Sequence, residues 1–492
     1  MTYNPITLID GYKVDHRRQY PVGTQHVYSN FTPRSSRVPG QEHVVFFGLQ
    51  YFTKKYLEEE ADVFFNQRRS FVAKQYEKRM AGYLGDFDFD VEHIMNLHEL
   101  GYMPLKICAL PEGTLTPLKV PMLTIENTID EFFWLVNYYE TILSSTLWLP
   151  CTTATTAYRF RSMLNNYFHK TNSGKYNNEV AYQGHDFSFR GLPGLEAAAL
   201  SGAAHLLSFN GTDTIPALDF IDHYYPSHDG VLKWHGFSVP ATEHSVMCAG
   251  GQENELDTFN RLLDLYPTGI VSVVSDTWDL WNVLDNILPS LKDKINSRDG
   301  KLVIRPDSGD PITIICGNAN GENQSAVRGV VETLWDTFGG TINSKGYKEL
   351  STKVGVIYGD GITYGVAMEI CNRLQTKGFA STNIVFGIGS FTYQYTTRDT
   401  YGFAMKATWV QINNKEYSIY KNPVTDNGMK KSATGRLAVH KNAEGKLYLI
   451  ENATEADEGY SLLEPVWIEG HSTSNQSFED VRSVLWSINN GA

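Results

Sequence analysis

Long apolar runs and a surplus of basic residues are both missing from this 492-residue sequence. No uninterrupted apolar stretch approaches the ~18 residues that a membrane-spanning helix requires, so we expect no membrane association. Residues 1–10 contain neither a basic segment nor an apolar core, and we therefore expect no secretory signal and a cytoplasmic location, in the host cytoplasm if the chain is viral. Lysine and arginine number 42 against 55 aspartates and glutamates, and the resulting net charge of −13 argues against nucleic-acid binding. An anionic ligand would need positive charge that is concentrated locally.

Cysteine is also scarce, with five residues that are scattered, odd in number and without a CxxC pair. This pattern predicts reduced thiols, and it favours neither a disulfide framework nor a zinc site. Hydrophobic residues make up 42% of the chain and charged residues 20%, which excludes a disordered or coiled-coil protein. The length is sufficient for more than one domain with a substantial core.

Three zones of different texture follow one another along the chain. Residues 1–150 mix short strands with helices, and Thr128 with Glu131 predicts a capping box at the start of a helix that continues to about Leu143. Residues 151–399 alternate strand and helix patterns. From about residue 400 to 492 the pattern is antiparallel, with an alternating run at 409–420 and two strand-like runs around a turn at 442–445. We expect this last zone to pack against the first.

Four apolar, β-branched runs stand out in the middle zone, at residues 269–275, 301–304, 353–358 and 383–386. Helical patterns separate them at 278–288, 325–338 and 365–375, and an alanine-rich helix is predicted at 195–207. Strand, helix and strand in succession predict right-handed crossovers and a parallel sheet, either open or closed into a barrel.

Functional side chains follow the end of each of the four runs. They are Asp276, the RPDSG segment 305–309, the GDG segment 359–361 and the GIGS segment 387–390. In parallel α/β folds ligands bind at this edge, and glycine turns let backbone N–H groups approach a phosphate. The dinucleotide fingerprint and the P-loop pattern are both absent, so the segments favour a phosphate-bearing sugar. Carboxylates beside it suit ribose hydroxyls or a hydrated Mg²⁺.

Three upstream segments are also rich in functional side chains: HDFSFRG at 185–191, GTDT at 211–214 and SVPATEHS at 238–245. Each also has a simple structural interpretation. The first could be a strand with a surface arginine, the second a turn with a helix cap, and the third a loop whose histidine is only hydrogen-bonded. Taken one at a time, these segments leave both interpretations open.

Taken together, the motifs resemble those of microbial or phage-type nicotinamide phosphoribosyltransferases. The resemblance also includes DGYKVDHRRQYP (10–21), FFGLQY (46–51), ENT (126–128), NSKGYK (343–348), TRD (397–399), KNPV (421–424) and GRL (435–437), so it covers essentially the whole chain in order. It implies an irregular parallel α/β barrel of the type II phosphoribosyltransferase kind at 151–399. It also implies a second α+β domain formed by residues 1–150 and completed by about 400–492.

The implied reaction joins nicotinamide to 5-phosphoribosyl 1-diphosphate, giving nicotinamide mononucleotide and diphosphate with Mg²⁺. The resemblance further implies a homodimer with shared active sites. It places the pyridine ring between Phe187 and Tyr12, with Tyr12 and the adjacent Asp10 coming from the partner subunit. Asp213 matches the acceptor of the carboxamide N–H, and Arg305 also borders the base. A carboxylate here would repel nicotinate, because the two charges are alike.

The resemblance assigns a larger set of residues to the phosphate groups and the ribose of the substrate. The resemblance assigns the leaving diphosphate to Arg190, His244 and Arg305, with Arg34, Lys406 and Lys421 as further basic residues. It assigns the ribose and 5-phosphate to Asp307, Gly359, Asp360, Gly389, Ser390 and Arg398. Asp276 matches an acid near the site, and no residue is firmly assigned to the metal, which we expect to be held through the substrate phosphates. The residues expected to carry the chemistry are His244, Asp307, Arg305 and Asp213.

His244 also matches the family's phospho-accepting histidine, through which ATP stimulates synthesis; imidazole is nucleophilic at neutral pH and suits this role. Ser390 departs from the family by replacing a glycine, and Ser188 with Phe189 replaces Gly-Tyr. Two other functions stay open: a nicotinate phosphoribosyltransferase, for which Asp213 is the discriminating residue, and a non-catalytic signalling homologue.

Overall fold

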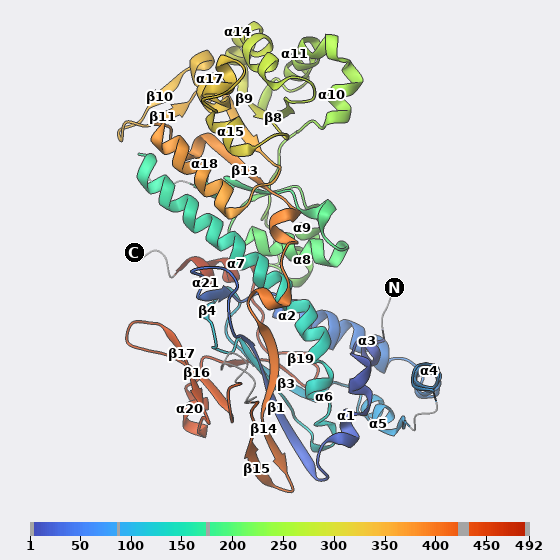
Figure 1. Ribbon diagram of the computed structural model, residues 1–492. Helices are drawn as coiled ribbons and strands as arrows, with labels where there is room; N and C mark the ends of the chain where they lie inside the picture. The colour runs from blue at the N-terminus through green and yellow to red at the C-terminus, as the bar shows by residue number, and fades with distance from the viewer. Residues whose placement is uncertain (1–3, 86–88, 174–177, 422–431, 488–492) are drawn as a thin grey trace. The chain divides into compact units, whose positions relative to one another are not determined.

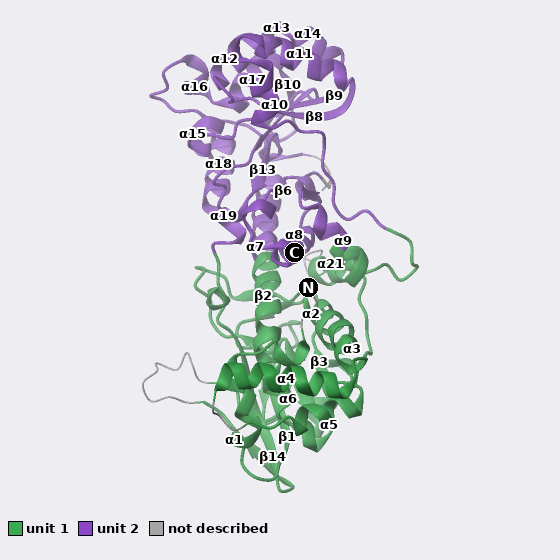
Figure 2. Ribbon diagram, turned by 90° about the vertical axis from the view of Figure 1, so that its right-hand side faces the viewer, with its two compact units in different colours: residues 1–155, 220–232, 396–492 green, residues 156–219, 233–395 purple. Residues whose placement is uncertain are grey.

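The structure is a computed structural model that describes residues 4–85, 89–173, 178–421 and 432–487. The described residues form two compact units, which Figure 2 shows in different colours. Unit 1 contains the residues up to 155, residues 220–232 and those from 396 onward, and unit 2 contains residues 156–219 and 233–395. Of the KNPV motif, only Lys421 lies within the described residues. In the part of the chain that is described, no helix combines the length and apolar composition needed to cross a bilayer.

Unit 1 is built on a seven-stranded antiparallel sheet in the order β15-β14-β1-β5-β3-β18-β19. Its long strand β1 (Thr24–Pro33) lies beside β14 (Phe403–Ile412), as Figure 1 shows, and on its other side it pairs with β5 (Leu123–Asn127). The predicted packing of the last zone against the first is therefore confirmed. The remaining strands of this sheet are β3 (Leu105–Ala109), β15 (Lys415–Ser418), β18 (Glu464–Ile468) and β19 (His471–Ser472).

The predicted antiparallel runs near the end of the chain are also confirmed. The β14–β15 hairpin turns at Asn413 and Asn414, which both have a positive φ, as asparagine tolerates in a tight hairpin turn. A second hairpin joins β16 (Leu437–Lys441) to β17 (Leu447–Glu451), and β2 (His43–Val45) pairs with β4 (Leu115–Pro117). The helices of unit 1 include α1 (His16–Gln19), α2 (Leu49–Phe52), α3 (Glu60–Phe65), α4 (Arg69–Leu84), α5 (Glu92–Leu100), α6 (Leu135–Tyr138), α20 (Glu455–Gly459) and α21 (Phe478–Ser487).

The predicted capping box at Thr128 and Glu131 is wrong. The Thr128 backbone N–H donates to the carbonyl of Pro104, and Glu131 Oε1 accepts a hydrogen bond from Asn96, so both groups have other partners. A single 3₁₀ turn, η4 (Asp130–Phe132), follows instead, and the helical segments are α6 and then the long α7 (Glu140–Thr171). The apolar period was read correctly, because Leu135 and Leu143 are fully buried.

Unit 2 is built on a six-stranded sheet in the order β7-β6-β13-β12-β9-β8, in which every neighbouring pair is parallel. The four predicted runs form β8 (Thr268–Val274), β9 (Asp299–Arg305), β12 (Val354–Tyr358) and β13 (Ile384–Ile388), and they are joined by the short β6 (Gly184–Asp186) and β7 (Gly211–Thr212). The strand residues belong to one apolar core that also includes side chains of α11, α17 and α18. One face of these strands packs against the helices and the other lines the apolar interior of the barrel, which explains the unbroken apolar runs.

The helices of unit 2 surround this sheet. They are α8 (Leu195–Leu206), α9 (Ile215–Tyr224, which ends in unit 1), α10 (His244–Gly250), α11 (Glu255–Leu265), α12 (Leu280–Asn282), α13 (Leu288–Ser290), α14 (Lys292–Ser297), α15 (Pro311–Cys316), α16 (Gln324–Arg328), α17 (Val330–Phe338), α18 (Tyr364–Thr376) and α19 (Ser390–Tyr393), with a hairpin of β10 (Gly340–Ile342) and β11 (Lys348–Leu350). The helix predicted at 325–338 is interrupted at Gly329, whose φ is +84°. That at 278–288 contains a π turn, η8 (Val283–Ile287).

One segment, residues 237–242, bonds to both edges of this sheet. Phe237 forms a parallel bridge with Gly211 of β7, and Ala241 forms one with Ser272 of β8. The flanking backbone bonds are Thr212 N–H to the Phe237 carbonyl (3.0 Å) and Thr242 N–H to the Ser272 carbonyl (3.0 Å). We call residues 237–242 the closing segment. The sheet is therefore curled into an irregular barrel, which decides between the open and closed alternatives.

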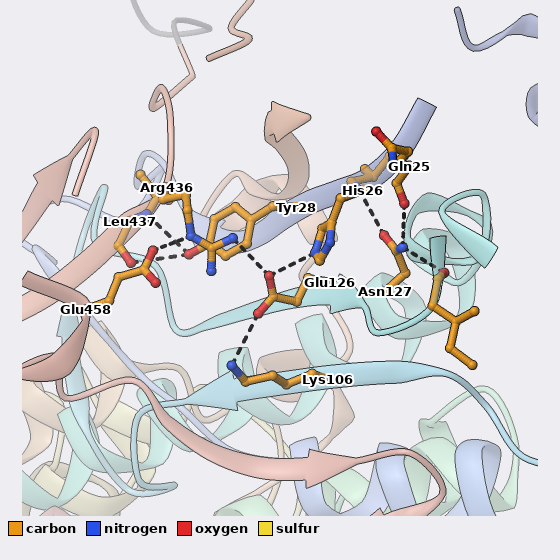
Figure 3. A network of polar contacts seen from close by, with 11 residues as sticks. Gln25, His26, Tyr28, Lys106, Glu126, Asn127, Arg436, Leu437 and Glu458 are labelled. Atoms are coloured by element: carbon orange, nitrogen blue, oxygen red, sulfur yellow. Dashed lines mark hydrogen bonds and ion pairs between the residues drawn. The ribbon is translucent and has the colours of Figure 1, made fainter. Parts of the chain in front are cut away.

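A buried ion network stabilises unit 1 around Glu126 of β5 (Figure 3). Glu126 accepts hydrogen bonds from His26 (3.1 Å) and Arg436 (3.0 Å) and lies 3.4 Å from the ammonium of Lys106. The Arg436 guanidinium stacks 4.5 Å from the centre of the Tyr28 ring and also pairs with Glu458. The network thus ties the first and last zones of the sequence together within one unit.

We expect Glu126→Gln to destabilise the protein most above pH 5. Burial alone would raise the pKa of Glu126, but the bond from His26 and the charges of Arg436 and Lys106 lower it to about 2 from its ordinary 4.5. Because the folded pKa is the lower one, the carboxylate contributes on the order of 3 kcal/mol above pH ~5, and this contribution is lost as the pH falls toward 2. Denaturant unfolding at several pH values measures it. Glu416→Gln, on the exposed β15, is the control, and equal curves for the two variants would contradict the assignment.

Candidate active site

Most of the residues singled out by the motifs lie together at the carboxyl edge of the unit 2 sheet. Because all six strands are parallel, the loops that follow them emerge on the same edge. This edge holds Phe187 and Arg190 after β6, Asp213 after β7, His244 after the closing segment, Asp276 after β8, Arg305 and Asp307 at the end of β9, Gly359 and Asp360 after β12, and Gly389 and Ser390 after β13.

A cavity of about 550 Å³ lies inside the barrel and extends from this edge toward the opposite one, where Glu179, Thr352 and Asn383 line it. Phe187, Asp213 and Arg305 all line it, together with His185 and Ser238. Its inner walls are largely apolar and come from strand side chains such as those of Ile270, Val303, Val354 and Val356. A concave apolar site with a few convergent polar groups is what a small planar ligand requires. His244, Asp307, Asp360, Arg190 and Ser390 are not among its lining residues.

Asp213 is held as a charged acceptor at the wall of this cavity. Its Oδ1 atom accepts hydrogen bonds from His185 Nε2 (2.8 Å) and from the hydroxyl of Ser238 (2.6 Å). Burial raises the pKa of Asp213, but the bond and charge of His185, the Ser238 bond and the charge of Arg305 together hold it below its ordinary value. Both of these donors use Oδ1, so neither of them occupies Oδ2.

The Phe187 ring lies directly on the backbone of two glycines. A Cβ atom on Gly387 would be 2.4 Å from the ring of Phe187, and one on Gly359 would be 2.8 Å from it. Any side chain at either position would therefore displace the ring, so these glycines make room for an aromatic wall. On its other side the ring borders His185, with centroids 5.0 Å apart. The family resemblance assigned Gly359 to the binding of the ribose. Its packing against Phe187 gives a second, structural reason why this position is a glycine.

Arg305 and Asp276 each have one buried polar atom without a hydrogen-bond partner among the described residues. Arg305 donates from Nη2 to the Thr242 carbonyl (2.9 Å), while its buried Nε has no partner within the described residues. Asp276 Oδ2 accepts from the Asp307 backbone N–H (2.8 Å) and the Ser308 hydroxyl (2.5 Å), while its buried Oδ1 likewise has none there. Buried polar atoms are almost always paired, so these two atoms are exceptions among the described residues.

His244 is accessible at the N-terminal end of α10. Its side chain is 48% exposed, with Nδ1 3.2 Å from the Thr277 hydroxyl and Nε2 3.9 Å from a carboxylate oxygen of Asp307. A hydrogen bond from Nδ1–H to Thr277 would leave the Nε2 lone pair available. The histidine therefore borders both the β8 and the β9 loops.

The two departures from the family pattern have local structural accounts. The hydroxyl of Ser390 occupies the space beside Gly191, where a Cβ would lie only 1.9 Å from it. Ser188 donates to the buried Asp186 from its backbone N–H (2.9 Å) and from its hydroxyl (2.6 Å), so it fixes the turn after β6. Phe189 is 40% exposed and makes no comparable contact.

The other predicted residues lie in unit 1. Tyr12 is 64% exposed beside Asp10, which accepts a hydrogen bond from Thr141 (2.8 Å). Four cations gather in the same unit: burial lowers the pKa of Lys406, and the charges of Arg34, Lys421 and Arg398 lower it further. Each unit thus carries one part of the predicted site, an aromatic and acidic cavity in unit 2 and an exposed tyrosine with a basic cluster in unit 1.

Three supporting residues were not identified from the sequence. His185 and Ser238 orient Asp213, and Glu140 binds the buried ammonium of Lys13 (2.8 Å) beside Tyr12. His185 and Ser238 lie within motifs already noted, one position after the start of β6 and one after the bridge at Phe237. Their roles depend on register between segments, which a single sequence does not contain.

Two protein families match this chain. Residues 182–458 match the nicotinate phosphoribosyltransferase (NAPRTase) family, and residues 4–107 match the N-terminal domain of nicotinamide phosphoribosyltransferase. The nicotinamide phosphoribosyltransferase of Acinetobacter baylyi is 50% identical over 496 residues, covering 98% of this chain and 97% of that protein. That of Mycoplasma pneumoniae is 40% identical over 450 residues, covering 87% and 94%.

Two solved structures share the fold. A nicotinate-nucleotide pyrophosphorylase from Pyrococcus furiosus has a TM-score of 0.60 at 15% identity, covering 99% of this chain and 95% of that one. Human nicotinic acid phosphoribosyltransferase has a TM-score of 0.53 at 16% identity, covering 97% and 93%. At these identities the likeness concerns the fold alone.

Proposed function

This chain belongs to the nicotinate phosphoribosyltransferase family, and from that membership we infer that it is a pentosyltransferase of NAD salvage. It condenses nicotinamide with 5-phosphoribosyl 1-diphosphate to give nicotinamide mononucleotide and diphosphate. Two relatives of nearly full length act as nicotinamide phosphoribosyltransferases by name, at 50% and 40% identity. The observation that carries the choice of the amide is Asp213, a carboxylate with a lowered pKa in the cavity wall.

The base side of the mechanism follows from the cavity. We propose that the pyridine ring lies against Phe187 and that its carboxamide N–H donates to Asp213. The ring nitrogen then faces the ribose, and its lone pair attacks the anomeric carbon as the bond to diphosphate breaks. No protein nucleophile is needed, so the chain contributes orientation and the exclusion of water.

The leaving-group side depends on positive charge. We propose that Arg190 and Arg305 bind the diphosphate as negative charge develops on it, while Asp307, Asp360 and the turn at Ser390 hold the ribose and 5-phosphate. Support comes from Arg305, which lines the cavity, and from Arg190, which is exposed on the same edge.

We propose Mg²⁺ as the cofactor, held mainly by substrate phosphates. Among the described residues no three His, Cys, Asp or Glu side chains converge closely enough to hold a metal ion alone. Asp276 and Asp307, whose backbone N–H donates to the Asp276 carboxylate, fit a hydrated ion that takes one or two carboxylates and completes its shell with phosphate oxygens and water. The ion would neutralise charge on the diphosphate.

We propose that ATP stimulates the reaction through His244. The γ-phosphoryl group would pass to a ring nitrogen, with ADP as the leaving group, and water would later release inorganic phosphate. The exposure of His244 and its position between Thr277 and Asp307 support this role.

One incubation tests the reaction as a whole. The purified chain, with nicotinamide, 5-phosphoribosyl 1-diphosphate and Mg²⁺, should release diphosphate and mononucleotide in equal amounts, and more so with ATP. Faster turnover of nicotinate would favour the acid as substrate. No release of diphosphate with either base would indicate a non-catalytic homologue.

We also propose a cytoplasmic homodimer in which the partner subunit supplies Tyr12 and Asp10. The exposed ring of Tyr12 and the basic cluster of unit 1 support this, because both suit contact with a substrate bound elsewhere.

Subunit mixing tests the shared site. Tyr12→Ala and Asp213→Ala should each be nearly inactive, and a co-refolded equimolar mixture should regain about a quarter of wild-type activity, since one site in four combines both native residues. Sedimentation shows whether the mixture is dimeric. An inactive but dimeric mixture would mean that Tyr12 and Asp213 of the same chain form the site.

A further inference from the structure

A buried histidine and tyrosine contact β7, the short strand that precedes Asp213. His205 on α8 is fully buried, and its two ring nitrogens have different partners. Nδ1 lies 2.6 Å from the hydroxyl of Tyr393 on α19, and Nε2 lies 3.0 Å from the carbonyl oxygen of Gly211, the first residue of β7. Neither His205 nor Tyr393 is part of the reaction described above.

The hydrogen-bond partners of His205 determine which of its ring nitrogens carries the proton. A carbonyl oxygen only accepts, so Nε2 carries the ring proton and donates it to Gly211. Burial lowers the pKa of His205 and raises that of Tyr393, so the ring is neutral and the phenol keeps its proton. Nδ1 is then an acceptor, and the Tyr393 hydroxyl donates to it. The tyrosine therefore selects the tautomer in which His205 can hold Gly211.

Gly211 in turn supports the acceptor of the carboxamide. It pairs in register with His185 of β6, and a Cβ on Gly211 would lie 2.7 Å from His185 Nδ1, so the His185 ring rests on the Gly211 backbone. The other nitrogen of that ring donates to Asp213 (2.8 Å), which is also only two residues beyond Gly211 in the chain. A shift of the Gly211 carbonyl would therefore move Asp213 through the strand and through His185 together.

Tyr393 reaches His205 from the turn that follows β13. Ser390, the first residue of α19, is three positions before it and belongs to the loop assigned above to the 5-phosphate. The hydrogen bonds from Tyr393 through His205 to Gly211 thus join the phosphate loop to the base-recognising strand inside unit 2.

We propose that Tyr393 and His205 are positioning residues that set the place of Asp213 and thereby the enzyme's preference for the amide over the acid. The inference rests on the proposed contact of Asp213 with the carboxamide. Without the tyrosine hydroxyl, the ring proton can move to Nδ1, and Nε2 then faces the Gly211 carbonyl with a lone pair instead of a proton.

Tyr393→Phe, which deletes one hydroxyl and keeps the ring, is the direct test. We expect the KM for nicotinamide to rise roughly five- to thirtyfold, the range expected when a buried hydrogen bond is lost and its partner left unpaired. The kcat and the KM for 5-phosphoribosyl 1-diphosphate should change by less than about twofold, and the preference for nicotinamide over nicotinate should fall with the rise in KM.

Matched variants separate positioning from stability. Tyr28→Phe likewise removes a buried tyrosine hydroxyl, one that donates to the backbone carbonyl of Leu437 (3.2 Å) in unit 1, and it should lower the Tm without changing base preference. His205→Gln can still accept from Tyr393 and donate to Gly211, so it should retain most of the preference, whereas His205→Leu should lose it. Tyr393→Phe should add little to His205→Leu, because the two residues act through one contact.

The outcomes distinguish this inference from the proposed function. If Asp213→Asn alters base preference and Tyr393→Phe changes only the Tm, the pair is structural and the inference is wrong. If Asp213→Asn itself leaves base preference unchanged, the proposed contact between Asp213 and the carboxamide is wrong, and the inference that rests on it is wrong as well. A shift in preference in Tyr393→Phe, with a stable fold and unchanged kcat, supports the inference.

Discussion

Asp213→Asn is expected to reverse much of the discrimination between nicotinamide and nicotinate. A charge-assisted hydrogen bond to the carboxamide is lost, and the like-charge repulsion of nicotinate is removed at the same time. We expect kcat/KM for nicotinamide to fall about tenfold to a hundredfold and the ratio of the two substrates to shift by about a thousandfold. Steady-state kinetics with each base measures both.

The variant should fold normally, because an asparagine oxygen can still accept from His185 and Ser238. Asp264→Asn, an exposed aspartate paired with Lys294 (2.6 Å), removes the same charge from unit 2 and should leave base preference unchanged. The lowered pKa of Asp213 keeps its carboxylate charged in mild acid, so the wild-type preference should not weaken between pH 8 and about 5. Equal kinetics of Asp213→Asn and wild type with both bases would show that Asp213 does not recognise the amide.

His244→Ala is expected to abolish the stimulation by ATP completely. The ratio of rates with and without ATP should fall to one, because no other group replaces the phosphoryl-accepting imidazole, while some basal synthesis should remain through Arg190 and Arg305. Acid-labile labelling of the protein from γ-labelled ATP should disappear with the stimulation.

Thr277→Val is the matched variant for that experiment. It deletes only the hydroxyl 3.2 Å from His244 Nδ1 and should weaken the stimulation without removing it. Full ATP stimulation in His244→Ala would show that a different residue accepts the phosphoryl group.

The strands of the barrel could be predicted from the sequence where their burial requires a continuous run of apolar residues. The four apolar runs became β8, β9, β12 and β13, because a sheet with helices on one face and an apolar barrel interior on the other selects unbroken β-branched segments. The short β6 and β7 have only a few residues, with polar and glycine positions, and are strands only through their pairing with neighbours. Pairing of this kind depends on contacts distant in sequence.

The long helix α7 illustrates a different limit. Its threonine-rich middle, residues 152–156, consists largely of a residue with modest helix propensity. In the structure the Thr152 and Thr155 hydroxyls donate to the carbonyls of Trp148 and Cys151, four residues earlier, and both side chains are buried. Tertiary packing therefore outweighs local preference here, and the predicted helix stopped short of this segment.

The candidate site could be located from the sequence because strand ends in a parallel sheet meet at one edge. Phe187, Asp213 and Arg305 line one cavity, as the motifs led us to expect. The tautomer of His205 and the packing of Phe187 on Gly387 could not be predicted, since each depends on distances of a few tenths of an ångström between separate loops.

The closing segment bears on the resistance of the protein to aggregation and to loss of activity. An open sheet presents two rows of unpaired amides and carbonyls, to which strands of other molecules can add. Here a single strip of six residues covers both borders, and it also carries Ser238 and ends two residues before His244. A proteolytic nick or an insertion in this strip would uncover both borders and displace Ser238 and the chain that leads to His244, so we expect aggregation and inactivation to begin with the same event.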